Sequence, residues 1–360
     1  MKDNKSPTCK IISIGLIGPG LIGSTLLQQI HHVTKAPNSN PQINFHVYGI
    51  MKSNRMLVSH NPIDLTTWEA QFNQCDTASN LDTFIEHMLI NTENPVIIDC
   101  TASEDISRQY LNMLAKGIHV ITPNKHANAG NLDYYKQIKL QTISGGNVRY
   151  LYEATVGAGL PIITTLQDMM KTGDRVLKIE GIISGTLNYI FSELAKNRPF
   201  SNVVIEAKQL GVTEPDPRED LSGMDVARKL VCLAREIGHE TTLNDVSIYN
   251  LVPADLASCT IDEFLEKLPL YNEHMQSMVI KANTDNAKLC YVGSIDSNGM
   301  VDVSIKAVSK DHPLARLNSK DNMLLIHTQR YHDNPLIIQG PVAGAELTAA
   351  GIFADLFRLA

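Results

Sequence analysis

The chain has 360 residues, 43% of them hydrophobic, which is enough for two domains of ordinary size. Its net charge is −7 and its basic residues are scattered, which argues against a surface for nucleic acid or for an anionic membrane. No apolar run reaches the roughly 20 residues that span a bilayer, and residues 1–9 are polar, unlike a signal peptide. The six cysteines lack Cys-x-x-Cys spacing, so we expect reduced thiols and a cytoplasmic protein.

A glycine-rich turn near the N-terminus predicts binding of a dinucleotide. Residues 11–16 form an apolar run typical of a strand, and residues 24–30 have the periodicity of a helix. Between them lies Gly-Pro-Gly-Leu-Ile-Gly, the Gly-x-Gly-x-x-Gly pattern in the strand–turn–helix context that such a site requires. N–H groups at the helix start would meet the phosphates. The residues expected to contact the cofactor are Gly18, Gly20, Leu21, Ile22 and Gly23.

Further strand–helix units predict an α/β domain with a doubly wound parallel sheet. Strands are expected over 43–50, 96–101 and 118–122, with a helix over 106–116. Ligands of such sheets lie at the carboxyl ends of the strands, and polar segments follow the strands here. By itself, the lysine after the last of these strands is better explained as a solvated residue at a helix start. The residues expected to line the cleft are Thr101, Ala102, Ser103 and Lys125.

The end of the second strand indicates the cofactor preference. Sites selective for NAD usually place an acidic residue there to bind the ribose 2′-hydroxyl. This chain has no acidic residue between the strand and Asp64, and Lys52 and Arg55 could pair with a 2′-phosphate. We therefore predict that the protein prefers NADP(H), with NAD(H) as the alternative cofactor.

A glycine-spaced loop, Glu153–Pro161, follows the predicted nucleotide domain. Its backbone carbonyls and the Glu153 carboxylate could coordinate a hard cation, because such ions take oxygen ligands. A tight crossover between two domains explains the same loop, and the two explanations are compatible. Pro161 suits the first position of a helix over 162–170.

A second candidate binding loop follows a strand expected over 179–183. The segment Ser184–Asn188 has the character of a helix start that is able to receive an anionic group. We therefore include Thr186 among the candidate substrate ligands.

The most informative stretch is Glu214–Lys229, in which two X-Pro bonds stiffen a segment crowded with carboxylates. We expect a helix to start directly after it, with Ser222 as N-cap and Asp225 completing a capping box. Asp225 and Lys229 are four residues apart and share a helix face. That pair alone is better explained as a surface salt bridge. A rigid acidic segment leading into a helix can, however, hold charged groups at fixed distances, as catalysis requires.

The last part of the chain shows weaker signals. Residues 246–329 contain short strands and polar turns without a chemical motif. A strand over 336–340, a glycine turn and a helix over 346–359 then predict a return to the nucleotide sheet.

Taken together, these segments resemble homoserine dehydrogenase, most closely the dehydrogenase portion of the bifunctional aspartokinase–homoserine dehydrogenases. The segments that start at Glu153 and Thr213 are long and highly specific, whereas residues 31–95 and 240–335 match only loosely. The matching segments, which span nearly the whole chain in the expected order, are Gly18–Gly23, Asp99–Ser103, Thr122–Lys125, Glu153–Pro161, Gly181–Leu187, Thr213–Lys229 and Thr348–Gly351.

The resemblance implies an NAD(P)-dependent interconversion of L-aspartate 4-semialdehyde and L-homoserine, in the biosynthesis of threonine, methionine and isoleucine. It implies that Lys229 is the proton donor and that Lys125 lies near the substrate and the nicotinamide. Asp220 matches a further carboxylate of the site, and Glu214 and Asp225 match substrate ligands of the family.

The resemblance also implies a cation, an assembly and a domain plan. The fold would be a Rossmann-type domain over residues 1–155, an α+β substrate-binding and dimerisation domain over 156–335, and a segment 336–360 that returns to the first domain. The protein would form at least a homodimer. The family's monovalent cation, usually sodium, would be bound by Glu153 and by the carbonyls of Val156, Ala158 and Leu160.

Two departures from the family's pattern matter. The closing Gly-Pro-Gly-Ala-Gly of the family is Gly-Pro-Val-Ala-Gly here, and the β-branched Val342 does not share the backbone freedom of glycine. This departure bears on the cofactor contact expected at Gly344. The 360 residues also contain no kinase and no regulatory domain, so we expect no feedback inhibition of this chain by threonine.

Two rival functions are open. An aspartate-semialdehyde dehydrogenase would need a nucleophilic cysteine, and neither Cys100 nor Cys232 lies in an evident activating setting. A catalytically silent dinucleotide sensor would keep the glycine turn but would have no reason to keep both Lys125 and Lys229 among matched carboxylates. An assay with homoserine and NADP⁺ separates the three functions.

Overall fold

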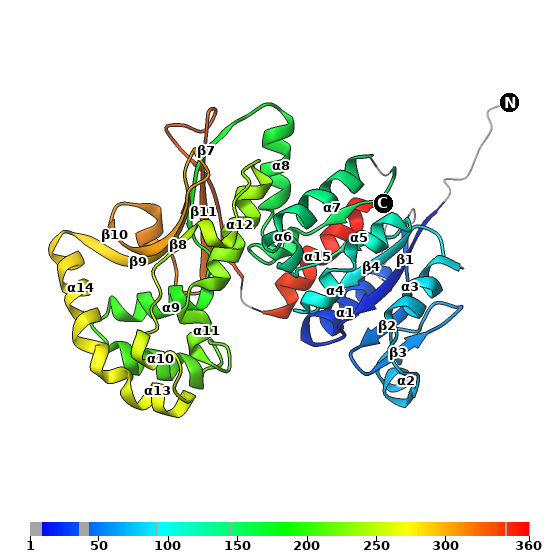
Figure 1. Ribbon diagram of the computed structural model, residues 1–360, viewed down its shortest axis with the longest axis horizontal. Coiled ribbons are helices and arrows are strands. Elements are labelled where there is room, and N and C mark those ends of the chain that lie inside the picture. Colours follow the sequence, from blue (N-terminus) through cyan, green and yellow to red (C-terminus); the bar gives the residue numbers. More distant parts are fainter. Residues whose placement is uncertain (1–8, 36–42, 91, 145, 343, 360) are drawn as a thin grey trace. The chain divides into compact units, whose positions relative to one another are not determined.

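The computed structural model describes residues 9–35, 43–90, 92–144, 146–342 and 344–359 (Figure 1). The chain divides into two compact units. The first unit comprises residues 1–159 and 344–360, and the second unit comprises residues 160–343.

The first unit contains a six-stranded sheet in the order β3-β2-β1-β4-β5-β6. Neighbouring strands are parallel except for β3, which forms an antiparallel hairpin with β2 at the edge. The predicted doubly wound α/β fold is therefore confirmed, with one antiparallel edge strand. The strands are β1 Lys10–Ile17, β2 Ile43–Lys52, β3 Arg55–Val58, β4 Pro95–Asp99, β5 His119–Ile121 and β6 Tyr150–Leu151.

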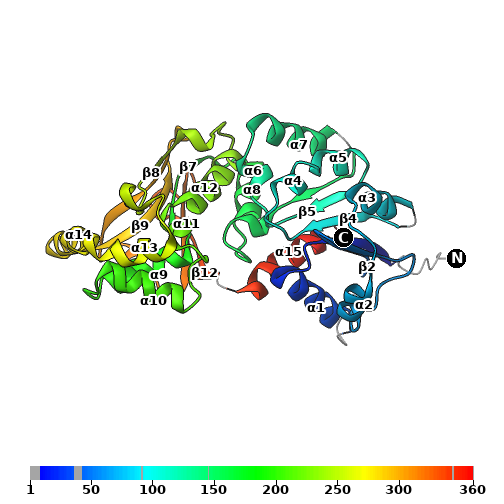
Figure 2. The same ribbon diagram turned by 60° about the horizontal axis from the view of Figure 1, so that its bottom comes forward.

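Helices cover both faces of this sheet (Figure 2). On one face, Gly15 and Gly49 leave room for Phe84, since a Cβ at Gly49 would lie 2.7 Å from its ring. The helices of this unit are α1 Leu21–Lys35, α2 Trp68–Gln74, α3 Leu81–Ile90, α4 Glu104–Ser107, α5 Tyr110–Ala115, α6 His126–Ala129, α7 Leu132–Ser144, the 3₁₀ helix η1 Glu153–Thr155 and α15 Ala345–Leu359.

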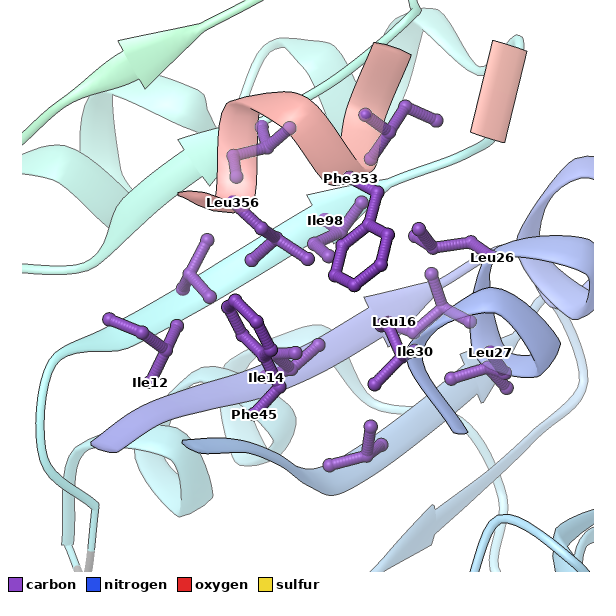
Figure 3. Packing of buried hydrophobic residues seen from close by; sticks show 14 of the residues in the cluster. Ile12, Ile14, Leu16, Leu26, Leu27, Ile30, Phe45, Ile98, Phe353 and Leu356 are labelled. Atoms are coloured by element: carbon purple, nitrogen blue, oxygen red, sulfur yellow. The ribbon is translucent and has the colours of Figure 1, made fainter. Parts of the chain in front are cut away.

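The other face carries the main core, where α1 and the C-terminal helix α15 lie side by side over β1 (Figure 3). Leu26 and Ile30 from α1 meet Phe353 and Leu356 from α15, all buried against the even-numbered residues of β1. Burial of each such side chain contributes about 1.5–3 kcal/mol. The end of the chain is therefore part of the first unit's core, as the sequence predicts.

The helix predicted over 106–116 is wrong in one respect, because the structure has two short helices, α4 and α5, in its place. The hydroxyl of Tyr134 causes the break. It donates to Ser107 O at 2.7 Å and accepts from Leu111 N at 3.3 Å, so it occupies the place of a helical hydrogen bond between these two residues. Local periodicity cannot reveal this insertion.

The second unit is an α+β fold around a six-stranded sheet in the order β12-β11-β7-β9-β10-β8. Only β8 and β10 pair in parallel. The strands are β7 Val176–Ile182, β8 Val246–Ile248, β9 Ala287–Ile295, β10 Val301–Ser309, β11 Asp321–Thr328 and β12 Leu336–Pro341. The helices are α8 Ile163–Lys171, α9 Gly185–Leu194, α10 Phe200–Gln209, α11 Pro217–Leu221, α12 Met224–Glu236, α13 Ile261–Lys267 and α14 Asn272–Thr284, with 3₁₀ turns η2 Leu243–Asp245, η3 Ala254–Leu256, η4 Leu268–Tyr271 and η5 Pro313–Arg316.

Two boundary predictions need correction. The strand over 336–340 does not return to the first sheet: as β12 it pairs with β11, because its alternate side chains fit the edge of the second sheet. The return begins only at Gly344. Pro161 lies just outside α8, whose N-cap residue is Ile162.

Within the described part of the chain, no helix has the length and apolar character needed to cross a bilayer.

Candidate active site

The glycine-rich turn between β1 and α1 has the geometry of a phosphate-binding turn. Gly18 has a φ of 86°, and a Cβ there would lie 2.7 Å from Thr101 Cγ2. A Cβ at Gly23 would lie 2.3 Å from Gly18 O, so the close approach of helix and strand requires glycine. Apart from Gly20 itself and its two chain neighbours, no heavy atom of the described residues lies within 4 Å of the Cβ position of Gly20, which leaves the backbone open to a ligand. Leu21, 76% exposed, begins the helix whose positive end faces this turn.

The basic pair predicted for a 2′-phosphate lies next to this turn. Gly18 donates its N–H to Met51 O at 2.8 Å, which joins the turn to the carboxyl end of β2. Lys52 and Arg55 are paired across the β2–β3 hairpin that follows. Arg55 Nη1 also donates to Asn73 O at 2.9 Å, and this bond orients the guanidinium. The preference for NADP(H) stays a prediction.

A buried polar network lies where β4 and β5 end. The carboxylate of Asp99, 0% exposed, accepts hydrogen bonds from Thr101 N at 2.8 Å, from Asn124 Nδ2 at 3.2 Å and from the Tyr110 hydroxyl. Burial raises the pKa of Asp99 above its usual range. Asn124 also donates to Ser103 O at 2.9 Å. The network therefore ties together two segments that were predicted to line the cleft.

Lys125 follows directly after this network, as the N-cap residue of the short helix α6. Its neighbour Asn124 is 4% exposed and accepts from His126 N at 2.9 Å, so the backbone on both sides of Lys125 is held. The support of this turn by Asp99, Tyr110 and Asn124 was not predicted. The sequence signal that could have indicated this network is a carboxylate, Asp99, at the end of an apolar strand.

The loop after β6 packs on the C-terminal helix through charged groups. Glu153, 2% exposed, donates its N–H to Asp355 Oδ2 at 2.9 Å. Arg358 Nη1 lies 3.2 Å from Glu153 Oε2 and 2.6 Å from Asp355 Oδ1, so one guanidinium offsets two buried carboxylates. Burial is the main reason that the pKa of Asp355 is raised to about 6.

This loop contains most of the predicted cation ligands. Glu153, Val156 and Ala158 lie in the first unit, whereas Leu160 begins the second unit. Ala158 has a φ of 53°, and a Cβ at Gly351 of α15 would lie 2.6 Å from Ala158 O. The loop thus approaches the helix backbone to backbone, which explains it as a tight crossover. The cation stays a prediction.

The charge on Asp355 leads to a pH-dependent stability. Because the pKa is higher in the folded protein than in the unfolded chain, Asp355 contributes stability below pH 4 that is lost as the pH rises through 6. The wild type should therefore lose stability relative to Asp355→Asn as the pH rises. We expect the difference between their free energies of unfolding to fall by up to about 3 kcal/mol between these limits.

Urea unfolding at a series of pH values measures this difference. Asp245→Asn is the matched control, because hydrogen bonds from Thr242 lower the pKa of Asp245. For this variant, the stability difference from the wild type should rise with pH instead of falling. A difference for Asp355→Asn that does not change with pH would contradict the assignment.

The acidic segment of the second unit folds into a short helix of its own, α11. Asp216 is its N-cap and accepts from Arg218 N at 3.0 Å, with Pro217 in the first turn. Asp220 Oδ2 accepts from Glu214 N at 2.8 Å, which folds the start of the segment back onto the helix. Burial raises the pKa of Asp220, and the hydrogen bond from the Glu214 N–H offsets part of this rise.

The predicted capping box at the start of α12 is wrong. Ser222 is the C-cap of α11, and the N-cap of α12 is Gly223, with a φ of 74° and no side-chain hydrogen bond. Because Pro217 and its cap already begin a helix five residues earlier than Ser222, a sharp turn at Gly223 must separate the two helices. Asp225 pairs with Lys229 instead of capping the helix.

Gly223→Ala should destabilise the second unit. A Cβ there would lie 2.1 Å from Tyr291 Oη, and the left-handed backbone alone costs about 1–3 kcal/mol for a residue other than glycine. We expect a lower melting temperature in a thermal unfolding scan. Gly211→Ala is the matched control, since Gly211 has a φ of 67° but no described atom within 4 Å of its Cβ position. Equal effects of the two substitutions would exclude the clash.

Lys229 is held in place by two acceptors. Its Nζ lies 2.8 Å from Ile183 O and 2.8 Å from Asp225 Oδ2, and its side chain is 15% exposed, against 50% for Asp225. Ile183 immediately precedes the Ser184 N-cap of α9, and Thr186 follows in the first turn, donating to Val212 O at 2.7 Å. The pair is therefore not an ordinary surface salt bridge, because the lysine side chain is largely buried.

The predicted site residues thus gather in two sets. Within the first unit, the glycine turn, the basic hairpin and the polar ends of β4 and β5 meet at the carboxyl edge of the sheet. Within the second unit, the starts of α9, α11 and α12 meet around the end of β7. The second set comprises Thr186, Glu214, Asp220, Asp225 and Lys229.

The cysteines give no support to a thiol nucleophile. All six are free, and Cys232 and Cys290 are buried. Burial raises the pKa of the Cys100 thiol well above its usual range and that of Cys290 to about 11. These thiols are therefore protonated at neutral pH, which weighs against the aspartate-semialdehyde dehydrogenase alternative.

Comparison with known protein families covers both units. A family model described as homoserine dehydrogenase matches residues 161–357, and a model described as the NAD binding domain of homoserine dehydrogenase matches residues 18–153.

Individual relatives agree with these models. The chain is 47% identical over 354 residues to bifunctional aspartokinase/homoserine dehydrogenase 2, chloroplastic, of Zea mays, covering 97% of this chain but only 38% of that protein. It is 37% identical over 358 residues to homoserine dehydrogenase of Schizosaccharomyces pombe, covering 97% and 95% of the two chains. A crystal structure of a Candida auris protein of unknown function matches with a TM-score of 0.90 at 38% identity, covering 97% and 98%. On these matches, the chain belongs to the homoserine dehydrogenase family.

Proposed function

We propose that this protein is a homoserine dehydrogenase that interconverts L-aspartate 4-semialdehyde and L-homoserine and prefers NADP(H). The observation that carries the proposal is the position of Lys229, whose side chain is 15% exposed and whose ammonium is held by two acceptors, Ile183 O and the Asp225 carboxylate. Family membership supports the reaction, and the basic hairpin at Lys52 and Arg55 supports the cofactor preference.

Lys229 is suited to act as the proton donor. The bound nicotinamide would supply the hydride, and the aldehyde oxygen would then carry developing negative charge. An ammonium group has three N–H donors, and in the described structure two of those of Lys229 point at Ile183 O and Asp225. The third is left for a substrate oxygen, which it would stabilise and then protonate. In the reverse direction, the neutral amine would accept the proton, so homoserine oxidation should be favoured at alkaline pH.

The neighbouring groups match the ends of the amino-acid substrate. Glu214, Asp220 and Asp225 supply negative charge within one short stretch, which suits the α-ammonium of homoserine. The first turn of α9, with Thr186, offers N–H groups to the α-carboxylate. Catalysis in this proposal also uses Lys125, beside the nicotinamide, and Glu153 as a ligand of sodium. The protein would act as a homodimer or a higher homo-oligomer.

The decisive experiment is the change in absorbance at 340 nm when the purified protein is given homoserine and NADP⁺. We expect NADPH to form, and we expect kcat/KM to be lower with NAD⁺. A protein that binds NADP⁺ but does not oxidise homoserine would be the silent sensor, and the proposed activity would be wrong. Activity that survives complete thiol alkylation would dismiss the semialdehyde dehydrogenase alternative.

A further inference from the structure

We propose that Arg218 is a positioning residue for the substrate site, because it clamps the acidic segment to a turn about 40 residues farther along the chain. This inference rests on the proposed function, since it assigns Arg218 a role in placing the carboxylates of that same site. Arg218 lies within the acidic segment, and nothing in its local sequence reveals its partners beyond Asp216.

One side of the clamp is the carboxylate of Asp216. Arg218 Nε lies 3.0 Å and 3.1 Å from the two carboxylate oxygens, and Nη2 lies 2.7 Å from Oδ2. The same carboxylate caps α11 by accepting from Arg218 N. The guanidinium holds the pKa of Asp216 below its usual range, so the cap stays ionised near neutral pH. This fork geometry is specific to arginine, because a lysine ammonium cannot make two parallel bonds to one carboxylate.

The other side of the clamp is the turn after η3. Arg218 Nη1 points at three backbone carbonyls, Leu256 O at 3.3 Å, Ala257 O at 3.2 Å and Cys259 O at 2.7 Å. The guanidinium also lies over the ring of the fully buried Phe264, 5.6 Å from its centroid. The arginine side chain is 17% exposed, so these contacts are shielded from solvent.

The contacts of Arg218 lie beside the protein carboxylates that are proposed to bind the substrate. Arg218 is in the first turn of α11, and Asp220 in the same short helix accepts from Glu214 N. A five-residue helix has little stability of its own, so its orientation depends on such tertiary contacts. The other end of α11 is tied to the same region, because Leu251 N donates to Leu221 O at 3.0 Å. Loss of the clamp should therefore displace Glu214 and Asp220 without removing any charge from them.

The test is steady-state kinetics of Arg218→Lys with homoserine and NADP⁺. Lysine keeps the positive charge but loses the fork, so we expect KM for homoserine to rise by about 10- to 100-fold while KM for NADP⁺ is unchanged. Arg198→Lys is the matched control. Arg198 also forms ion pairs within the second unit, with Glu193 and Glu206, and its replacement should leave both KM values unchanged.

A second variant keeps the test informative if Arg218→Lys does not fold. Asp216→Asn keeps a good helix cap but removes the ion pair, and it should raise KM for homoserine in the same direction by a smaller factor. Unchanged KM for homoserine in both variants would overturn the role of Arg218, as would an equal loss in every kinetic parameter that follows a lower melting temperature. An inactive wild type, by contrast, would overturn the proposed function itself and this role with it.

Discussion

Lys229→Ala is expected to lower kcat by about 10²- to 10⁴-fold while the affinity for the cofactor changes little. The substitution removes the donor that is held between Ile183 O and Asp225 and leaves the cofactor turn of the first unit untouched. Without it, the developing charge on the reacting oxygen loses the stabilisation by this ammonium group, and water must supply the proton.

The measurement is the rate of NADPH formation at saturating homoserine, with cofactor binding measured separately by fluorescence. Lys306→Ala is the matched control, because Lys306 is also paired with an aspartate four residues away, Asp302 at 3.2 Å, but lies on β10. That variant should keep its kcat. A near-normal kcat of Lys229→Ala would remove Lys229 from its role as proton donor.

The double substitution of Lys52 and Arg55 by alanine should change the cofactor preference. We expect kcat/KM for NADPH to fall by about 10- to 100-fold, because two cations that could bind the 2′-phosphate are lost, while kcat/KM for NADH stays the same. Kinetics with both cofactors at low ionic strength give the comparison, since exposed charge interactions weaken in salt.

Arg149→Ala is the control for the loss of a positive charge in the same unit. Arg149 precedes β6 and therefore lies at the amino end of the parallel strands, away from the glycine turn. An equal or higher kcat/KM of the wild type with NADH would overturn the predicted preference.

Much of this molecule can be predicted from its sequence, where the signal is local. The glycine turn, the strands of the first sheet and the apolar stripe of the final helix depend on backbone freedom and on side-chain periodicity, which are read within about ten residues. The same holds for the acidic segment, since proline and closely spaced carboxylates predict a stiff charged turn. The resemblance to the family then assigned roles to residues that local chemistry could only mark as candidates.

The errors of prediction have different physical causes. Tyr134 breaks a helix from 27 residues away, whereas the capping box at Ser222 is wrong because Pro217 and its cap start an earlier helix. The strand β12 joins the second sheet because its partner β11 offers a free edge, which is a property of the sheet and not of residues 336–341.

The sequence by itself determined which residues are candidates for the chemistry, because charge, glycine spacing and proline are properties of single positions. Only the tertiary structure decided how these residues are held. The Asp99 carboxylate that binds Asn124, the Ile183 carbonyl that binds Lys229 and the carbonyls around Arg218 each lie far along the chain from the residue that they hold. A buried polar group must find its partner in space, and the folded path of the chain, not the distance along it, brings that partner near.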